Sequence, residues 1–94
     1  MFVIRNVFKC KPGQAKHLVE RLKNSMALME DTNQRVLVDH VASFWTVVLE
    51  IQTESVGQWE QQFQEYGKRA DVQEAMSGYL DFVESGYREI FRIA

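Results

Sequence analysis

Residues 1–10 read MFVIRNVFKC, a stretch of strand-forming side chains with a carboxamide at its centre, and the rest of the fold follows from it. Alternation along Phe2 to Cys10 places Phe2, Ile4, Asn6, Phe8 and Cys10 on one face of a strand. The remaining residues, Val3, Arg5, Val7 and Lys9, lie on the other face. The first face is the more apolar and predicts contact with a helix layer, so Asn6 would point into the core or into a cavity beside it.

The segment after this strand predicts an amphipathic helix. Pro12 suits the first turn of a helix because its missing N–H group would have no partner there. Apolar residues then recur at helical spacing to about Asp31, at Ala15, Leu18, Val19, Leu22, Met26 and Met29. This single apolar stripe would cover one face of the sheet.

Two more strands are predicted after the polar turn Asp31-Thr32-Asn33. We place them at Arg35 to Ala42 and Phe44 to Thr53, too close together for anything but an antiparallel hairpin. The second strand carries Trp45, Val47, Leu49 and Ile51 on one face, with Phe44, Thr46, Val48 and Glu50 on the other. Neither face of this strand is fully polar.

The last third of the chain predicts a second helix and a final strand. Ser55 followed by Gln58 has the capping-box pattern that opens a helix. The helix has the apolar stripe Val56, Trp59, Phe63 and Tyr66, with a break at Gly67 and a continuation from about Asp71 to Glu84. Ser85-Gly86 would end this continuation, and Tyr87 to Ile93 would be the last strand, with Tyr87, Phe91 and Ile93 on one face.

The element order is therefore β-α-β-β-α-β. It folds most simply as a ferredoxin-like α+β domain, a four-stranded antiparallel sheet with both helices on one face. At 94 residues the chain has no material for a second core, so we expect residues 1–94 to form one domain.

Two helices can cover only one side of the sheet, which leaves an apolar patch on the other side. Its expected members are Val3, Val7, Leu37, Val41, Phe44, Val48 and Ile90. Charged residues on the same face, Arg5, Asp39, Glu50, Arg88 and Arg92, could pair across an interface. Because soluble monomers rarely expose such patches, we predict a homodimer that closes through the open sheet face.

Composition excludes several classes of function. The net charge is −2 and basic residues are interleaved with acidic ones, which argues against a nucleic-acid partner. No apolar run approaches the roughly 20 residues that span a bilayer, so we expect no membrane partner and a cytoplasmic location. Cys10 is the only cysteine, and phosphate loops, serine elbows and zinc motifs are absent, so we expect no cofactor and no metal.

The chain resembles the dimeric α/β-barrel superfamily, particularly small proteins of the antibiotic-biosynthesis monooxygenase type. The resemblance rests on FKCKPGQAKHLVERL, FWTVVLEIQTES, SVGQWEQQF and ADVQEAM, and it covers nearly the whole sequence. It implies a dimeric α/β barrel. Members of the superfamily include cofactor-independent oxygenases of electron-rich aromatic compounds, haem-degrading enzymes and proteins of no known role.

The haem-degrading branch has an Asn on the first strand, a Trp on the second helix and a His later in that helical region that binds iron. Asn6 and Trp59 resemble the first two. At the expected position of the histidine this chain has Met76 and Ser77, so the resemblance does not favour haem degradation.

The candidate catalytic residues are Asn6 and His40. Asn6 could position a phenolate or carbonyl, and His40, on the face of Val36 and Val38, could serve as a general base. The candidate ligand-binding residues are the aromatics Trp59, Trp45, Phe63 and Tyr87. Each has a structural alternative: a satisfied core amide for Asn6, a locally paired histidine for His40, and core packing for the aromatics.

Two functions follow. One is a cofactor-independent monooxygenase acting on a small electron-rich aromatic compound. The alternative is a non-catalytic small-molecule-binding or assembly module of the same fold, in which the aromatics fill the core.

Overall fold

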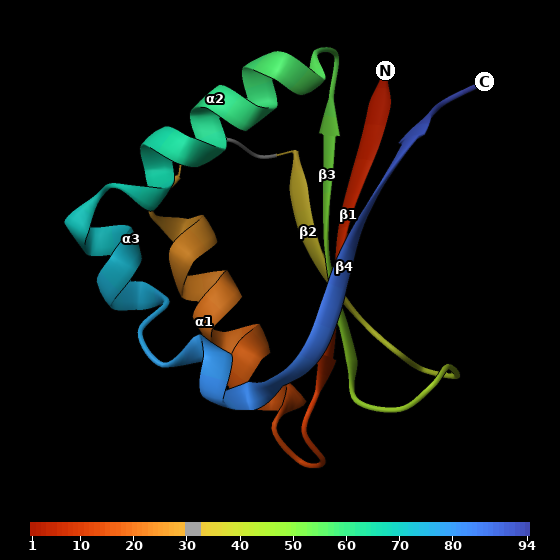
Figure 1. Ribbon diagram of the computed structural model, residues 1–94, viewed down its shortest axis with the longest axis vertical. Coiled ribbons are helices and arrows are strands. Elements are labelled where there is room, and N and C mark those ends of the chain that lie inside the picture. Colours follow the sequence, from red (N-terminus) through yellow and green to blue (C-terminus); the bar gives the residue numbers. More distant parts are fainter. Residues whose placement is uncertain (30–32) are drawn as a thin grey trace.

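The computed structural model describes residues 1–29 and 33–94. Along the chain it contains β1 (Phe2–Cys10), α1 (Ala15–Ala27), β2 (Gln34–Val38), β3 (Thr46–Thr53), α2 (Val56–Gly67), α3 (Ala70–Ala75), the 3-10 helix η1 (Tyr79–Phe82) and β4 (Val83–Arg92). The strands form one antiparallel sheet in the order β2-β3-β1-β4, and all the helices lie on one of its faces (Figure 1). The predicted ferredoxin-like α+β class is confirmed.

Strand β1 is central because it pairs with β3 on one side and with β4 on the other. Asn6 lies opposite Leu49 on β3 and opposite Arg88 on β4, so these three side chains share a face. Ile4 lies on this same face and has no solvent exposure. The helix-facing side of the sheet therefore has a polar position at its middle, as the alternation along residues 2–10 predicts.

The core lies between this face and the helices. Its buried members are Ile4, Cys10, Leu18, Leu22, Val47, Leu49, Ile51 and Trp59. Leu18 and Leu22 belong to the predicted stripe of α1, and Trp59 belongs to the predicted stripe of α2. No helix in the described parts of the chain has the length and apolarity needed to cross a membrane.

Helix α2 begins at the predicted position. The side chain of Ser55 accepts a hydrogen bond from the backbone N–H of Gln58, at 3.2 Å, and so satisfies one of the unpaired donors of the first turn. This cap fixes where α2 starts, and therefore where Trp59 and Phe63 meet the sheet. Helix α1 ends at Ala27, before the predicted end near Asp31, which lies outside the described residues.

The predicted helix from Asp71 to Glu84 is wrong in its second half. Helix α3 ends at Ala75, and Gly78 adopts a left-handed conformation with φ of 75° that interrupts the helical path. The chain then makes one turn of 3-10 helix and enters β4 at Val83. Ser85 and Gly86 lie within β4 rather than ending a helix.

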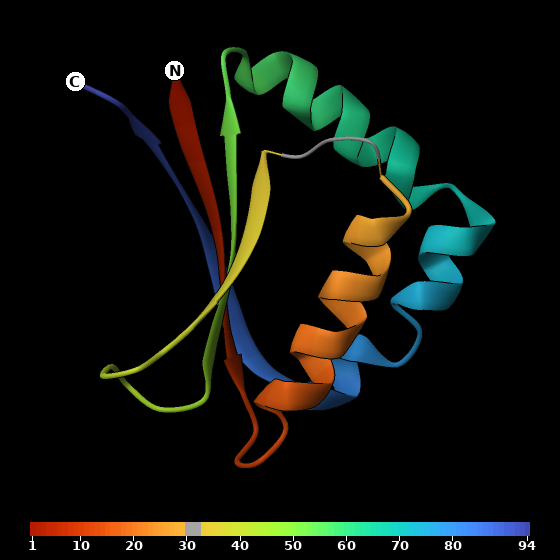
Figure 2. The same cartoon turned by 180° about the vertical axis from the view of Figure 1, so that it is seen from behind.

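The predicted hairpin strands are too long at their shared end. Strand β2 stops at Val38. Strand β3 starts only at Thr46, because Phe44 and Trp45 have left-handed φ values of 66° and 54° that break the extended path before it. The intervening loop leaves the sheet on the side away from the helices (Figure 2). His40 and Trp45 therefore lie in this loop and not on strands.

The predicted faces of the last strand are reversed. Pairing with β1 places Arg88, Ile90 and Arg92 on the helix side, opposite Asn6, Ile4 and Phe2. Tyr87 and Phe91 lie on the open face, opposite Val7 and Val3. Both faces of β4 mix apolar and charged residues, so alternation alone does not tell which one is covered.

Candidate functional site

A cavity of about 750 Å³ lies between the helix layer and the sheet. Its walls come from β1, β2, β3, β4, α1, α2, α3 and η1, so every one of these elements contributes to it. Most of the lining side chains are apolar, including Phe8, Leu22, Met26, Leu49, Ile51, Trp59, Phe63, Val72, Met76 and Leu80. Cavities of this size and character hold drug-sized ligands.

Asn6 is the polar centre of the sheet wall. It is 5 % exposed, and its Oδ1 accepts a hydrogen bond of 2.6 Å from Nε of Arg88. The two residues are far apart in the sequence and meet because they are register partners on β1 and β4. The predicted amide therefore lines the cavity and is paired with a cation.

Two aromatic rings hold this cation in place. The guanidinium carbon of Arg88 lies 4.9 Å from the ring centroid of Trp59 and 5.4 Å from that of Phe63. The two rings lie 5.2 Å apart and are tilted by 34°. Stacking on aromatic faces suits a planar guanidinium and restricts its motion. Helix α2 thus supplies the rings, β4 the cation and β1 the amide that orients it.

Arg88 is the only charged side chain among the lining residues that the structure describes. The other polar groups of the lining are the amides of Gln34, Gln62 and Gln73, the hydroxyl of Ser25, and tyrosine hydroxyls. An apolar cavity with one positive charge at its side favours ligands that carry electron-rich oxygen atoms.

The cavity opens to solvent beside β4, which is an edge strand. Two of its lining side chains are large, apolar and exposed: Phe63 at 42 % and Leu80 at 67 %. Arg88 belongs to the exposed stretch of the same strand. The cation therefore lies near the entrance, with the methionine-rich interior behind it.

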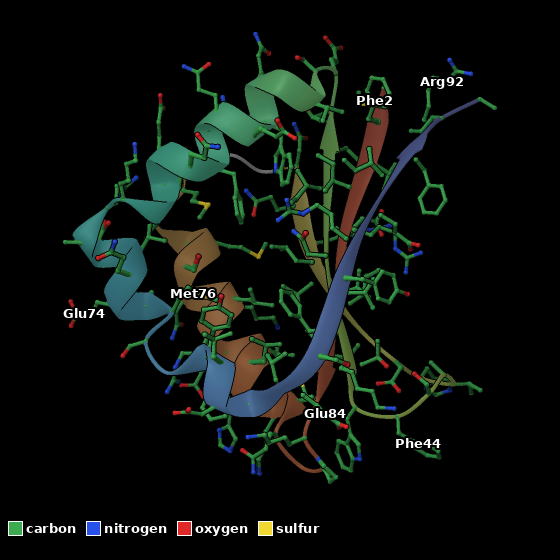
Figure 3. The ribbon with its side chains drawn as sticks, in the orientation of Figure 1. Phe2, Phe44, Glu74, Met76, Glu84 and Arg92 are labelled. Atoms are coloured by element: carbon green, nitrogen blue, oxygen red, sulfur yellow. The ribbon has the colours of Figure 1, made fainter. Side chains whose placement is uncertain are left out.

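Met26, Met29 and Met76 line the interior. Met29 Sδ accepts a hydrogen bond of 3.6 Å from Nε2 of Gln34, and Met76 packs against the core from the helix side (Figure 3). At the place where the haem-degrading branch would have its histidine, this chain therefore has a thioether in the cavity wall. Ser77 lies outside the lining, with its carbonyl oxygen bonded to Nε of Arg21 at 3.0 Å.

The structure brings together four of the six residues predicted for the site. Asn6, Trp59 and Phe63 line the cavity, and Tyr87 borders it from β4 while its side chain lies on the open face of the sheet. Tyr87 also borders a hollow of about 330 Å³ on the open face of the sheet. Trp59 is a core residue, at 5 % exposure, and is also part of the cavity wall. The core-packing and ligand-binding interpretations of this residue are therefore compatible.

His40 and Trp45 are not part of the cavity lining. His40 is exposed in the loop between β2 and β3, and its expected orientation toward the helices does not hold because β2 ends at Val38. Trp45 is 43 % exposed, and its carbonyl oxygen accepts the backbone N–H of Cys10 at 2.8 Å. Its contribution to the sheet is made by its backbone.

Sequence reasoning missed Arg88 as a site residue because it placed Arg88 on the open face. The sequence did contain a usable signal. Asn6 lies as far from the start of β1 as Arg88 lies from the end of β4, so antiparallel pairing of the two strands brings the two residues side by side. Within residues 1–29 and 33–94, no three His, Cys, Asp or Glu side chains gather in a way that could hold a metal ion.

Comparisons with known proteins identify the fold of this chain. No protein-family model matches the sequence, and no curated protein matches it. Among solved structures, a NIPSNAP family protein from Agrobacterium tumefaciens str. C58 superposes with a TM-score of 0.85 at 10 % identity, over 99 % of this chain and 92 % of that chain.

Two further structures are of candidate antibiotic biosynthesis monooxygenases. The one from Chloroflexus aurantiacus J-10-fl has a TM-score of 0.76 at 13 % identity, over 99 % of this chain and 92 % of that chain. The one from Nitrosomonas europaea has a TM-score of 0.71 at 11 % identity, over 99 % and 98 %. The chain therefore has the fold shared by NIPSNAP family and antibiotic-biosynthesis-monooxygenase-like proteins, the fold that the resemblance implied.

Proposed function

We propose that this protein binds a small, largely apolar molecule in the cavity between sheet and helices, with an oxygen atom of the molecule held by Asn6 and Arg88. The observation that carries the proposal is the Arg88–Asn6 hydrogen bond of 2.6 Å at the wall of an apolar cavity of about 750 Å³. Small-molecule sites typically combine apolar walls with a few convergent polar groups that fix orientation.

The rings of Trp59 and Phe63 support a flat ligand. Their centroids lie 5.2 Å apart, and both rings also contact the guanidinium of Arg88. An aromatic ligand could pack beside them by offset stacking. The thioethers elsewhere in the lining would adapt to its outline, because methionine side chains are flexible and polarisable.

A second candidate function is cofactor-independent oxygenation of an electron-rich aromatic compound. It is favoured by the same pair of donors, which would stabilise the anion of a phenol or of an activated methylene group. Oxidation of such a methylene to a ketone consumes one O2 and releases one water, so atoms balance without a further reductant. The described lining contains no histidine or carboxylate, so the substrate proton would have to leave to solvent.

A thermal-shift screen tests the binding proposal. Quinols, polyphenols, anthrone-like compounds, flavins and haem would each be added to the wild type, to Asn6→Ala and to Asn24→Ala, whose amide is exposed on α1. A ligand at 100 times its Kd adds about 2.7 kcal/mol to stability, and each kcal/mol raises Tm by roughly 4–8 °C in a chain of this size. We expect a shift that Asn6→Ala reduces and Asn24→Ala retains.

Oxygen uptake with the compounds that bind distinguishes the two functions. Consumption of one O2 per molecule converted, lost in Asn6→Ala, would establish the oxygenase. Binding without oxygen uptake would leave a binding module, and the absence of a shift with every class would contradict both.

We also propose that two copies pair through the open sheet face. A row of alternating charges crosses this face, with Arg35 on β2, Glu50 on β3, Arg5 on β1 and Glu89 on β4. Within the chain, Arg35 pairs with Glu50 at 2.9 Å and Arg5 with Glu89 at 3.3 Å. A second copy turned by 180° about an axis parallel to the strands would place opposite charges against each other along the row.

A further inference from the structure

We propose that the ligand of the cavity carries a carboxylate, which Arg88 and Asn6 bind at the entrance while an apolar body fills the interior. This inference rests on the proposed binding function and adds the chemical class of the ligand. It makes Arg88, which the sequence analysis placed on the open face, the residue that determines specificity.

The first argument is that Arg88 has donors to spare. Its Nε is bonded to Asn6, which leaves Nη1 and Nη2 for other partners. In the described parts of the chain, the recorded ion pairs join carboxylates to Arg5, Arg35 and Arg69, and none of them involves Arg88. Two adjacent N–H groups in one plane match the two oxygens of a carboxylate.

The second argument is the orientation of Asn6. An arginine can only donate, so the amide must turn its Oδ1 toward Arg88, and its Nδ2 donor is then free to face the cavity. The site thus presents donors from both residues. A group that accepts several hydrogen bonds at once satisfies it, whereas an alcohol or an amide would bring donors of its own.

The third argument is the charge of the cavity. The described lining holds no Asp or Glu, and the cation is stacked over Trp59 and Phe63. A neutral ligand entering here would displace water from Arg88 without neutralising it, which costs free energy. A carboxylate would compensate the charge in the same step.

The fourth argument is position. Arg88 lies on the exposed stretch of the edge strand β4, whereas the lining methionines are half-buried and Leu22 is buried. A molecule with one anionic end could keep that end partly hydrated at the entrance. Its apolar body would lie along the thioethers and aliphatic side chains of the interior.

Matched probe pairs test the inference by titration calorimetry. The flat pair is 2-naphthoate and 2-naphthamide, and the flexible pair is decanoate and decanamide; members of each pair have nearly the same shape and differ in charge. In the wild type we expect the carboxylate of at least one pair to bind about tenfold more tightly or better, since a hydrogen bond to a charged group is the stronger kind. Added salt should weaken the binding of the carboxylate and leave the binding of the amide unchanged.

The variants are Arg88→Gln, Arg88→Lys and the control Arg92→Gln. Arg92 lies on the same strand and face as Arg88 but outside the cavity lining. We expect Arg88→Gln to reduce the ratio of carboxylate affinity to amide affinity to about one. Arg88→Lys should keep part of the preference for the carboxylate, and Arg92→Gln should keep the full preference. Circular dichroism establishes that each variant folds, and if Arg88→Gln does not fold, Arg88→Lys and the salt dependence carry the test.

Equal binding of acid and amide, or a ratio that Arg88→Gln leaves unchanged, would overturn the carboxylate inference while supporting the cavity as a binding site. Failure of all four probes to bind would overturn the carboxylate inference. Ligands found in the thermal-shift screen would then still uphold the proposed function, so the two failures are distinguishable.

Discussion

At the scale of single residues, the site depends on a contact between Asn6 and Arg88 that only the sheet register reveals. Alternation along β1 is enough to predict that Asn6 faces the helices, because its neighbours on that face are apolar. For Arg88 the alternation is uninformative, because β4 is an edge strand with mixed faces. To predict that Arg88 lies beside Asn6, one would have to know that the first and last strands pair, and in which register.

Cys10 is a residue whose burial gives stability a pH dependence. It has no solvent exposure, and burial, followed by the nearby charge of Asp39, raises the pKa of its thiol above the ordinary value of 9.0. The unfolded chain therefore loses this proton at lower pH than the folded chain. The folded state then binds more protons, and the free energy of unfolding falls as pH rises above about 9.

The measurement is urea denaturation of the wild type and of Cys10→Ala between pH 7 and pH 10. Cys10→Ala leaves a small gap and should be less stable at every pH. We expect its stability to fall less steeply than that of the wild type above about pH 9. Parallel curves over this range would show that the thiol is as easily ionised in the folded protein as in the unfolded chain.

At the scale of elements, β4 illustrates what the sequence could not supply. The order and type of the elements followed from periodicity, and the start of α2 followed from its cap. The start of β4 did not, because the apolar residues of segment 79–83 fit a helix as well as a strand, and Gly86 suggested an end rather than a middle. The bends at Phe44 and Trp45 are equally invisible, since aromatic residues rarely adopt left-handed φ values.

Gly86 lies within β4 because the backbone of β1 passes close to it. A Cβ atom at this position would lie 2.9 Å from the carbonyl oxygen of Val7 and 3.5 Å from Cδ1 of Phe8. We therefore expect Gly86→Ala to destabilise the protein by about 1–3 kcal/mol, the usual cost of overpacking. Because Gly86 also lines the cavity, the change should weaken ligand binding too.

The matched control is Gly67→Ala at the end of α2, where a Cβ atom would meet nothing within 4 Å. There the substitution should be neutral or stabilise by up to about 1 kcal/mol, because alanine restricts the unfolded chain. Urea denaturation of both variants gives the comparison. Equal stabilities for Gly86→Ala and the wild type would mean that β4 can move away from β1 at little cost.

At the scale of the whole molecule, the two faces of the sheet differ in the side chains that they carry. The helix side holds the cavity, and the open side carries the charge row together with exposed Tyr87 and Phe91, at 62 % and 51 %. The hairpin loop extends on the open side (Figure 2) and carries Phe44 (Figure 3), which is 74 % exposed. Val41 in the same loop is 90 % exposed. An exposed face of this kind, balanced in charge and rimmed by apolar side chains, suits a second copy of itself.

Adjacent residues of β4 provide a test of this pairing, because Phe91 points to the open face and Ile90 to the helix side. Phe91→Glu would place a carboxylate in the proposed interface twice, once from each copy, and we expect it to shift the protein from dimer to monomer in analytical ultracentrifugation. Ile90→Glu adds the same charge one position away, at a residue 41 % exposed, and should leave a dimer. A wild type that sediments as a monomer at micromolar concentration would overturn the proposal, and loss of the dimer in both variants would place the interface elsewhere than on the open face.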